Sequence, residues 1–240
     1  MRFDGRRREE LRLLKIELSP IRYAEGSALV KMGNTEVLCA VSVEERVPRW
    51  LQGRGRGWLT AEYALLPRAT HTRTDRSHIR GGRAQEIRRL IGRSLRQAVR
   101  LDLLDGYTLI VDCDVLQADG GTRTASINGG YVAVALAVRG LVKRGLVRSA
   151  ALMPPVAALS VGTVDGEPLV DLAYEEDAQA EMDLNVVMNA AGQFIEVQGT
   201  AEGAPVSRGQ LDRLLDLAAS GIETVVTAQR EVLKCAGFEV

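Results

Sequence analysis

The stretch from Tyr107 to Lys143 reads YTLIVDCDVLQADGGTRTASINGGYVAVALAVRGLVK, and it predicts three elements in succession. Its first part, Tyr107–Gln117, is rich in β-branched residues and is typical of a strand. Asp119-Gly120-Gly121 interrupts that pattern, because glycine pairs mark turns. A run of small and apolar residues from about Thr122 to Lys143 then predicts a helix.

Further strands are expected on both sides of this stretch. They are Leu11–Leu18, Ala28–Met32, Thr35–Val43, Trp58–Leu65, Pro155–Val164, Pro168–Leu172, Leu184–Met188 and Phe194–Gln198. Tight hairpin turns at Gly33-Asn34 and Asp165-Gly166 join two pairs of them. The first third of the chain is therefore expected to begin as an antiparallel sheet.

Two more helices are predicted. Apolar residues recur at helical spacing between Arg83 and Arg100, with most arginines on other faces. A last helix opens at Ser207, where Gln210 completes a capping box, and extends to about Lys234. Strands and helices interleave without strict βαβ regularity, which favours an α+β fold with a mixed β-sheet packed against α-helices. No repeat or linker divides the chain, so residues 1–240 are expected to form one domain.

The formal net charge is zero, but positive and negative side chains are segregated along the chain. Residues 46–100 hold 14 basic and 3 acidic side chains, and residues 101–240 hold 9 basic and 20 acidic ones. All the basic side chains of the first segment are arginines, whose planar forks pair with phosphates. Two interpretations stay open for this segment: a phosphate-binding surface, or a solvated, salt-bridged surface that could face the acidic half of another subunit.

Three cysteines and one apolar run bear on the compartment. Cys39, Cys113 and Cys235 are widely separated in apolar surroundings, which suits buried thiols in a reducing compartment. The apolar run at Tyr131–Val138 is too short to span a membrane, and charged residues interrupt the N-terminus where a signal peptide would need apolar ones. The protein is therefore expected in the cytoplasm, without a membrane partner.

The glycine turn is a candidate anion site. Glycines that leave a strand let the backbone approach an anion, and a helix start offers unpaired amides with a positive dipole end. Arg123 would add a bidentate clamp. A glycine pair alone is more often only a turn, but Arg83 follows Gly81-Gly82 at the start of its own helix. Two such helix starts could converge on one phosphate.

Asp177 and Asp183 lie six residues apart in an acidic segment that precedes an apolar strand. Carboxylates bind Mg²⁺, which assists phosphoryl transfer, although acidic residues in such segments are usually just solvated. His71 and His78 have no neighbours at metal-ligand spacing, so both are expected to be loop residues.

These motifs together resemble the ribonuclease PH family, the bacterial phosphorolytic exoribonucleases that mature the 3′ ends of tRNA. The resemblance spans nearly the whole chain and is carried by residues 2–6, 33–39, 57–63, 66–70, 89–93, 112–115, 117–126, 176–177 and 181–183. It implies removal of 3′ nucleotides as nucleoside diphosphates, with inorganic phosphate as co-substrate. The reaction would be reversible.

The resemblance also implies roles for individual residues. Phosphate would be held by Arg83, Gly121, Thr122 and Arg123, and the tRNA 3′ region by Arg68, Arg73 and Arg76. Asp177 and Asp183 would be the catalytic carboxylates that hold Mg²⁺ or Mn²⁺. The family assembles as a homo-hexamer, a ring made of three dimers.

Two alternatives stay open on the sequence. A non-catalytic, RNA-binding ring subunit of the same fold would be expected to lose the clamp or the aspartate pair, and this chain keeps both. A hydrolytic two-metal nuclease would need the paired carboxylates but no phosphate clamp.

Overall fold

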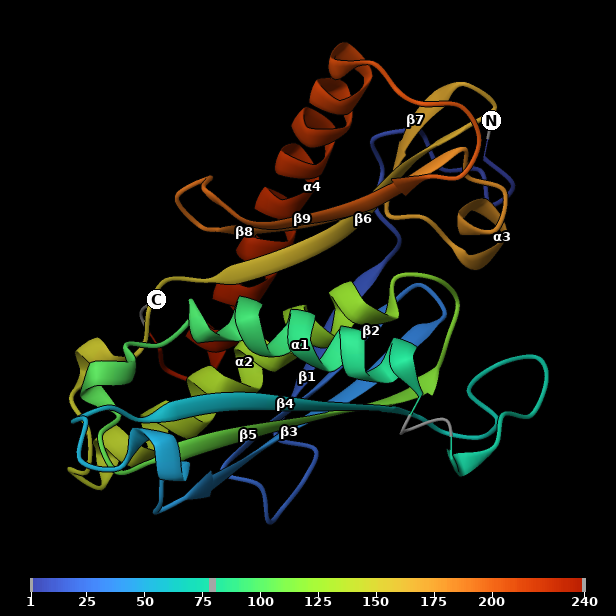
Figure 1. Cartoon of the computed structure of the whole chain (residues 1–240). Helices are drawn as coiled ribbons and strands as arrows, with labels where there is room; N and C mark the ends of the chain where they lie inside the picture. The colour runs from blue at the N-terminus through green and yellow to red at the C-terminus, as the bar shows by residue number, and fades with distance from the viewer. Residues whose placement is uncertain (1, 78–80, 239–240) are drawn as a thin grey trace.

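The computed structural model describes residues 2–77 and 81–238, and the strands described there form two sheets (Figure 1). The first sheet has the order β1-β2-β3-β5-β4. Its strands are β1 (Leu14–Leu18), β2 (Gly26–Met32), β3 (Thr35–Glu44), β4 (Trp58–Leu65) and β5 (Thr108–Gln117). Only the β4–β5 pair among them is parallel, so this sheet is mixed.

The second sheet is antiparallel throughout and has the order β7-β6-β8-β9. Its strands are β6 (Val156–Val164), β7 (Glu167–Val170), β8 (Met182–Asn189) and β9 (Phe194–Ala201). The α-helices are α1 (Gly82–Arg96), α2 (Thr122–Lys143), α3 (Tyr174–Asp177) and α4 (Arg208–Cys235). Short 3₁₀ helices, η1 (Arg49–Leu51), η3 (Leu101–Leu103) and η4 (Ser149–Ala151), lie in the connections.

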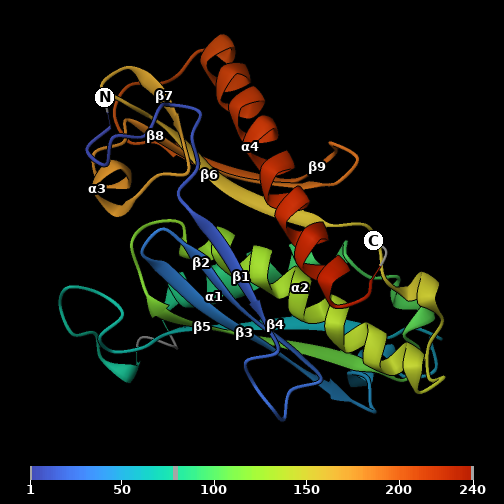
Figure 2. The ribbon, with the colours of Figure 1, turned by 180° about the vertical axis from the view of Figure 1, so that it is seen from behind.

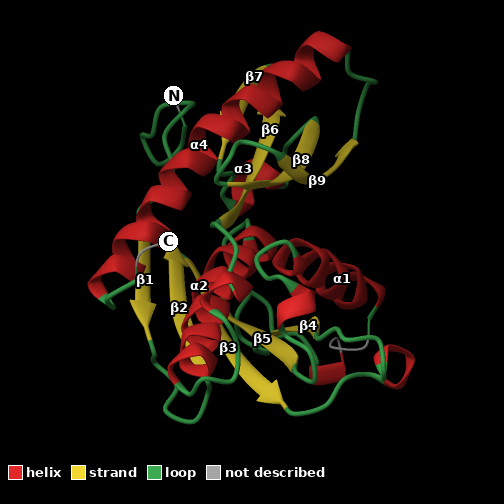
Figure 3. Cartoon of the chain, turned by 90° about the vertical axis from the view of Figure 1, so that its left-hand side faces the viewer, coloured by secondary structure: helices red, strands yellow, loops and turns green. Residues whose placement is uncertain are grey.

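Sheets and helices alternate in layers. Helix α2 lies between the two sheets, where it contacts β2 and β3 on one side and β6 on the other, and α1 lies beside it over β4 (Figure 3). Helix α4 covers the far face of the second sheet, against β6 and β7 (Figure 2). The small and apolar side chains of α2 follow from this position, because a helix covered on two sides buries most of its surface.

Helix α2 as a whole is long and apolar enough to cross a membrane, which the shorter run at 131–138 did not suggest. However, 78% of its apolar window is buried inside the protein. Tyr131, Val134 and Leu141 are each at most 1% exposed, and one apolar cluster joins them to residues of both sheets. Its composition is therefore that of a core helix.

The predicted α+β class with mixed pairing is confirmed, as are both hairpin turns. Some details were wrong, and three of them bear on the packing. Strand β1 begins at Leu14 rather than Leu11, and α1 ends at Arg96 because residues 97–100 turn away toward η3. Cys39 and Cys113 are buried as expected, but Cys235 is exposed at the end of α4. Folding of residues 1–240 as one domain stays a prediction.

Candidate phosphate and carboxylate site

A cavity of about 480 Å³ brings together side chains from both halves of the chain. Six residues predicted to bind phosphate or to act in catalysis all line it: Arg83, Gly121, Thr122, Arg123, Asp177 and Asp183. They come from the starts of α1 and α2, the end of α3 and the start of β8. The structure therefore confirms that these residues meet, while their roles stay predictions.

The glycine turn between β5 and α2 forms one wall of the cavity. Gly120 and Gly121 both have left-handed backbones, with φ of 74° and 65°. A Cβ atom at Gly120 would lie 2.5 Å from the backbone oxygen of Leu172, so only glycine fits there. Because Gly121 is the N-cap of α2 and has no side chain, the amides of the first helical turn stay available to an anion.

Two arginines act on this cavity from two helix starts. Arg83 is the second residue of α1, and Arg123 is the second residue of α2. The Arg123 Nη1 atom lies 3.7 Å from Glu86 Oε1 and 3.4 Å from Gln198 Oε1, which hold its guanidinium at the cavity wall. Both arginines line the cavity together with Tyr63 and Asp177, and their positive charges oppose the rise that burial causes in the pKa of those two groups.

The two aspartates also line the cavity. Asp177 ends α3, and Asp183 is the second residue of β8. Burial and the nearby charge of Asp183 raise the pKa of Asp177, and the charges of Arg83 and Arg123 oppose that rise. Carboxylates this close repel each other when both are ionised. A cation or a shared proton would relieve that repulsion.

Magnesium fits such a pair of carboxylates. The ion keeps several waters and is usually bound through one or two carboxylates together with substrate phosphates. Within residues 2–77 and 81–238, no three His, Cys, Asp or Glu side chains cluster as a complete metal site. The chain therefore offers part of a magnesium shell, and a phosphate substrate would have to complete it.

Among the polar residues that also line the cavity, and that the sequence did not assign to the site, are Tyr63, Ser160 and Asn185. The Tyr63 hydroxyl lies 2.8 Å from Thr122 Oγ1. Burial raises the pKa of Tyr63, although the Thr122 hydrogen bond and the charge of Arg83 oppose the rise, so the phenol stays protonated. Ser160 and Asn185 are cross-strand partners on β6 and β8. In the sequence, Ser160 and Asn185 could have been recognised as candidate site residues because each is a polar residue at a core-facing position of a strand.

The basic loop between β4 and α1 lies at the mouth of the site. Arg68, Arg73 and Arg76 are exposed and do not line the cavity, whereas Thr70 and His71 of the same loop do. Figure 1 shows this loop extending away from the layered body. Arg68 donates a hydrogen bond of 2.9 Å to the carbonyl oxygen of His71. His78 lies outside the described residues.

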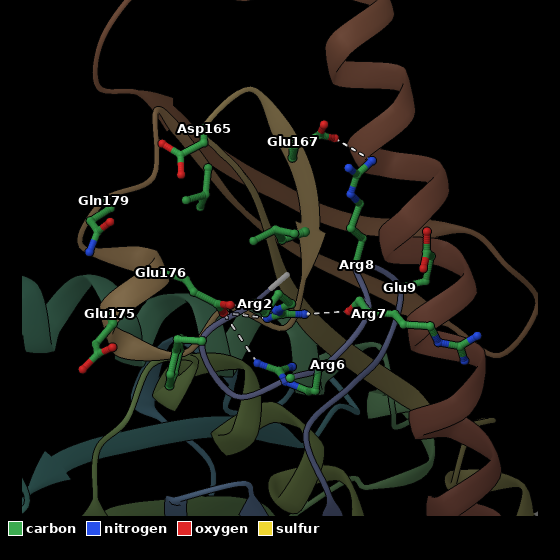
Figure 4. A pocket seen from close by; sticks show the side chains of 14 residues that line it. Arg2, Arg6, Arg7, Arg8, Glu9, Asp165, Glu167, Glu175, Glu176 and Gln179 are labelled. Atoms are coloured by element: carbon green, nitrogen blue, oxygen red, sulfur yellow. Dashed lines mark hydrogen bonds and ion pairs between the residues drawn. The ribbon is translucent and has the colours of Figure 1, made fainter.

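A second hollow, about 710 Å³, lies between the N-terminal segment, the β6–β7 turn and α3 (Figure 4). Its arginines are largely used in ion pairs. Arg2 and Glu176 form a buried pair at 2.6 Å, and Arg8 lies 2.6 Å from Glu167. Arg2 also donates to the carbonyl oxygens of Val170 and Asp171. The ion pair between Arg2 and Glu176 therefore anchors α3, which carries Asp177. The arginines of this hollow are already paired and do not form a second anion site.

Comparisons with known proteins agree with this geometry. Residues 10–139 match the model of domain 1 of the 3′ exoribonuclease family, and residues 154–221 match domain 2. A protein named ribonuclease PH from Moorella thermoacetica is 54% identical over 236 residues, which cover 97% of this chain and 94% of that protein.

Two solved structures share the fold. One is rice (Oryza sativa) Rrp46, with a TM-score of 0.78 at 20% identity, over 97% of this chain and all of that chain. The other is an archaeal exosome core, with a TM-score of 0.78 at 24% identity, over 95% of this chain and 90% of that chain.

Proposed function

We propose that the described cavity is the phosphorolytic centre of the protein. The premise is that the chain belongs to the ribonuclease PH family of 3′ exoribonucleases. The family resemblance read from the sequence is thereby confirmed. The protein is a phosphorolytic 3′-to-5′ exoribonuclease, a nucleotidyltransferase that uses inorganic phosphate to release nucleoside diphosphates.

The observation that carries the assignment of the site is the meeting of two arginines and one open helix start beside two carboxylates. Orthophosphate and the RNA phosphodiester are both anions, and they repel each other at the distance needed for attack. Near a protein surface, each pair of unit charges 4 Å apart contributes about 4 kcal/mol. The charges of Arg83 and Arg123, with the amides of Gly121 and Thr122, would offset that repulsion.

In the reaction, an oxygen of the bound phosphate attacks the phosphorus of the last phosphodiester. A P–O–P anhydride bond forms, the bond from phosphorus to the preceding 3′ oxygen breaks, and a nucleoside diphosphate leaves. The shortened RNA takes up a proton on its 3′ oxygen. Asp177, whose pKa is raised by burial and by the neighbouring Asp183, is suited to hold that proton. When bound, Mg²⁺ or Mn²⁺ would stabilise charge on the transferred phosphoryl group.

The finer features of the substrate and assembly follow the family. We propose that the RNA is the 3′ end of tRNA precursors, and that exposed Arg68, Arg73 and Arg76 contact its phosphates from the basic loop. Six subunits would form a ring of three dimers, and one structure with this fold is an exosome core. The segregated charge of the chain fits such contacts between subunits. Buried, free Cys39 and Cys113 suit a reducing cytoplasm.

The test is product analysis with a tRNA that carries a 3′ extension. In the presence of phosphate the products should be nucleoside diphosphates, and removal of phosphate should stop shortening. Arg123→Ala should lower the rate by roughly 10²-fold, as removal of an oxyanion donor does. Nucleoside monophosphates made without phosphate would instead show a hydrolytic nuclease, and RNA binding without any shortening would show a non-catalytic ring subunit.

A further inference from the structure

The guanidinium of Arg12 is buried directly behind the glycine turn. Its side chain is 5% exposed, and it forms an ion pair of 2.6 Å with Asp171, whose side chain is fully buried. The Arg12 Nε atom and backbone amide also donate to Asp171 Oδ2, at 3.0 and 2.8 Å. Arg12 is thus fixed on one side by three donors to a single carboxylate, which leaves the other edge of its fork facing the turn.

That other edge binds the carbonyl oxygens of the turn. Arg12 Nη1 donates to the carbonyl oxygen of Asp119, and Nη2 lies 3.5 Å from that of Gly120. Thr35 adds two bonds: its hydroxyl donates to the Gly120 carbonyl at 2.6 Å and accepts from the Asp119 amide at 3.0 Å. Successive carbonyls of the turn are therefore held on the side of Arg12 and Thr35.

We propose that Arg12 is a positioning residue for the bound phosphate, acting through the Asp119–Gly121 turn. This inference rests on the proposed phosphate-binding role of that turn. Arg12 does not line the cavity, so it does not touch phosphate itself. By holding the turn's carbonyls on its own side, it keeps the first amides of α2 directed at the anion, where a carbonyl would repel it.

The shape of arginine is essential to this role. One planar fork reaches Asp171 and two carbonyl oxygens at once, whereas the single ammonium of lysine could keep the ion pair but not all the carbonyl contacts. A Cβ at Gly121 would lie 3.0 Å from Arg12 Nη2, so the guanidinium packs closely against the turn. Arg12→Lys should therefore loosen the turn while keeping the buried charge paired.

The experiment measures phosphorolysis by Arg12→Lys and Thr35→Val, with Arg8→Lys as the matched control. Arg8 belongs to the same N-terminal segment, but its ion pair with Glu167 is half-exposed and involves no residue of the turn. Both Arg12→Lys and Thr35→Val should raise the KM for phosphate about tenfold, because Arg12→Lys loses a charge-assisted hydrogen bond to the turn and Thr35→Val loses two neutral ones. The KM for RNA should stay within about twofold, and Arg8→Lys should match the native protein.

Arg123→Ala, measured alongside, separates this inference from the proposed function. If Arg123→Ala raises the KM for phosphate and the two turn variants do not, the phosphate site stands and the role of Arg12 is refuted. If none of the three changes it, both fail. Loss of thermal stability in Arg12→Lys with an unchanged KM for phosphate would show a purely structural ion pair. Should Arg12→Lys not fold, Thr35→Val decides alone, because valine keeps the shape of threonine without its hydroxyl.

Discussion

Gly120→Ala should disable the site, because the added methyl group would clash with the backbone of a neighbouring segment. The added Cβ would lie 2.5 Å from the oxygen of Leu172 and 2.8 Å from the amide nitrogen of Tyr174. Both neighbours are backbone atoms at the entry to α3, so no side chain can move aside. The glycine turn and α3 must separate, and this displaces Gly121 relative to Asp177.

The magnitude follows from two contributions. A left-handed backbone costs a non-glycine residue roughly 1–2 kcal/mol, and overpacking adds about 1–3 kcal/mol. Gly166 offers a matched control, because its φ of 73° nearly equals the 74° of Gly120 while its Cβ would meet nothing within 4 Å. Gly166→Ala should therefore lose only the first amount, and the difference between the variants isolates the contact with α3.

Thermal unfolding and phosphorolysis kinetics measure the two effects. At about 2–4 °C per kcal/mol for a chain of this size, Gly120→Ala should unfold several degrees below Gly166→Ala. Its kcat/KM for phosphate should fall by roughly 10²-fold, as a displacement near 1 Å of reacting groups can cause, whereas Gly166→Ala should keep native activity. Equal stability and equal activity in the two variants would refute the close approach of the turn to α3.

Three further predictions concern charges. The pKa of Asp177 is higher in the folded protein than its ordinary value of 3.8. Protonated Asp177 therefore stabilises the fold fully at pH values below 3.8, and this stabilisation is lost as the pH rises through the raised pKa. Asp177→Asn should therefore unfold at a higher temperature than the native protein near neutral pH but not in acid, while losing phosphorolysis; a lower unfolding temperature near neutral pH would contradict this. Arg2→Ala should lower the free energy of unfolding by about 3 kcal/mol, because buried Glu176 would be left with its longer ion pair of 3.5 Å to Arg6. Arg7→Ala, whose side chain is 85% exposed, should change it by less than about 0.5 kcal/mol in denaturant titrations. Each of Arg68→Ala, Arg73→Ala and Arg76→Ala should reduce the slope of log RNA affinity against log salt by about 0.7, and exposed Arg208→Ala should not; unchanged slopes would exclude the loop as an RNA contact.

Local patterns predicted the parts of the fold that depend on neighbouring residues. The helix predicted from about Thr122 to Lys143 is confirmed, because Gly121 and the apolar run after it determine both its start and its buried faces. The hairpins at Gly33 and Gly166 were predicted because each turn needs a left-handed residue. Arg83 and Arg123 were placed together because glycine-preceded helix starts have a specific anion chemistry, and the family resemblance added the two aspartates to the same site.

Long-range contacts were not visible in the sequence. Nothing near Arg12 indicates that Asp171, far along the chain, holds it, and this pairing lies where the predicted strand from Leu11 was wrong. Helix α3 was read only as an acidic segment, because its anchor is the distant Arg2. Division of the strands into two sheets likewise depends on how α2 separates them, which periodicity does not reveal.

Orthophosphate as the attacking group is tested most directly by following its phosphorus atom. The protein would be incubated with ³²P-labelled orthophosphate and an unlabelled RNA, and the released nucleotides would be separated. The label should appear in the β-phosphate of the nucleoside diphosphates, one label for each nucleotide removed. Release of unlabelled nucleoside monophosphates at the same rate would contradict the account.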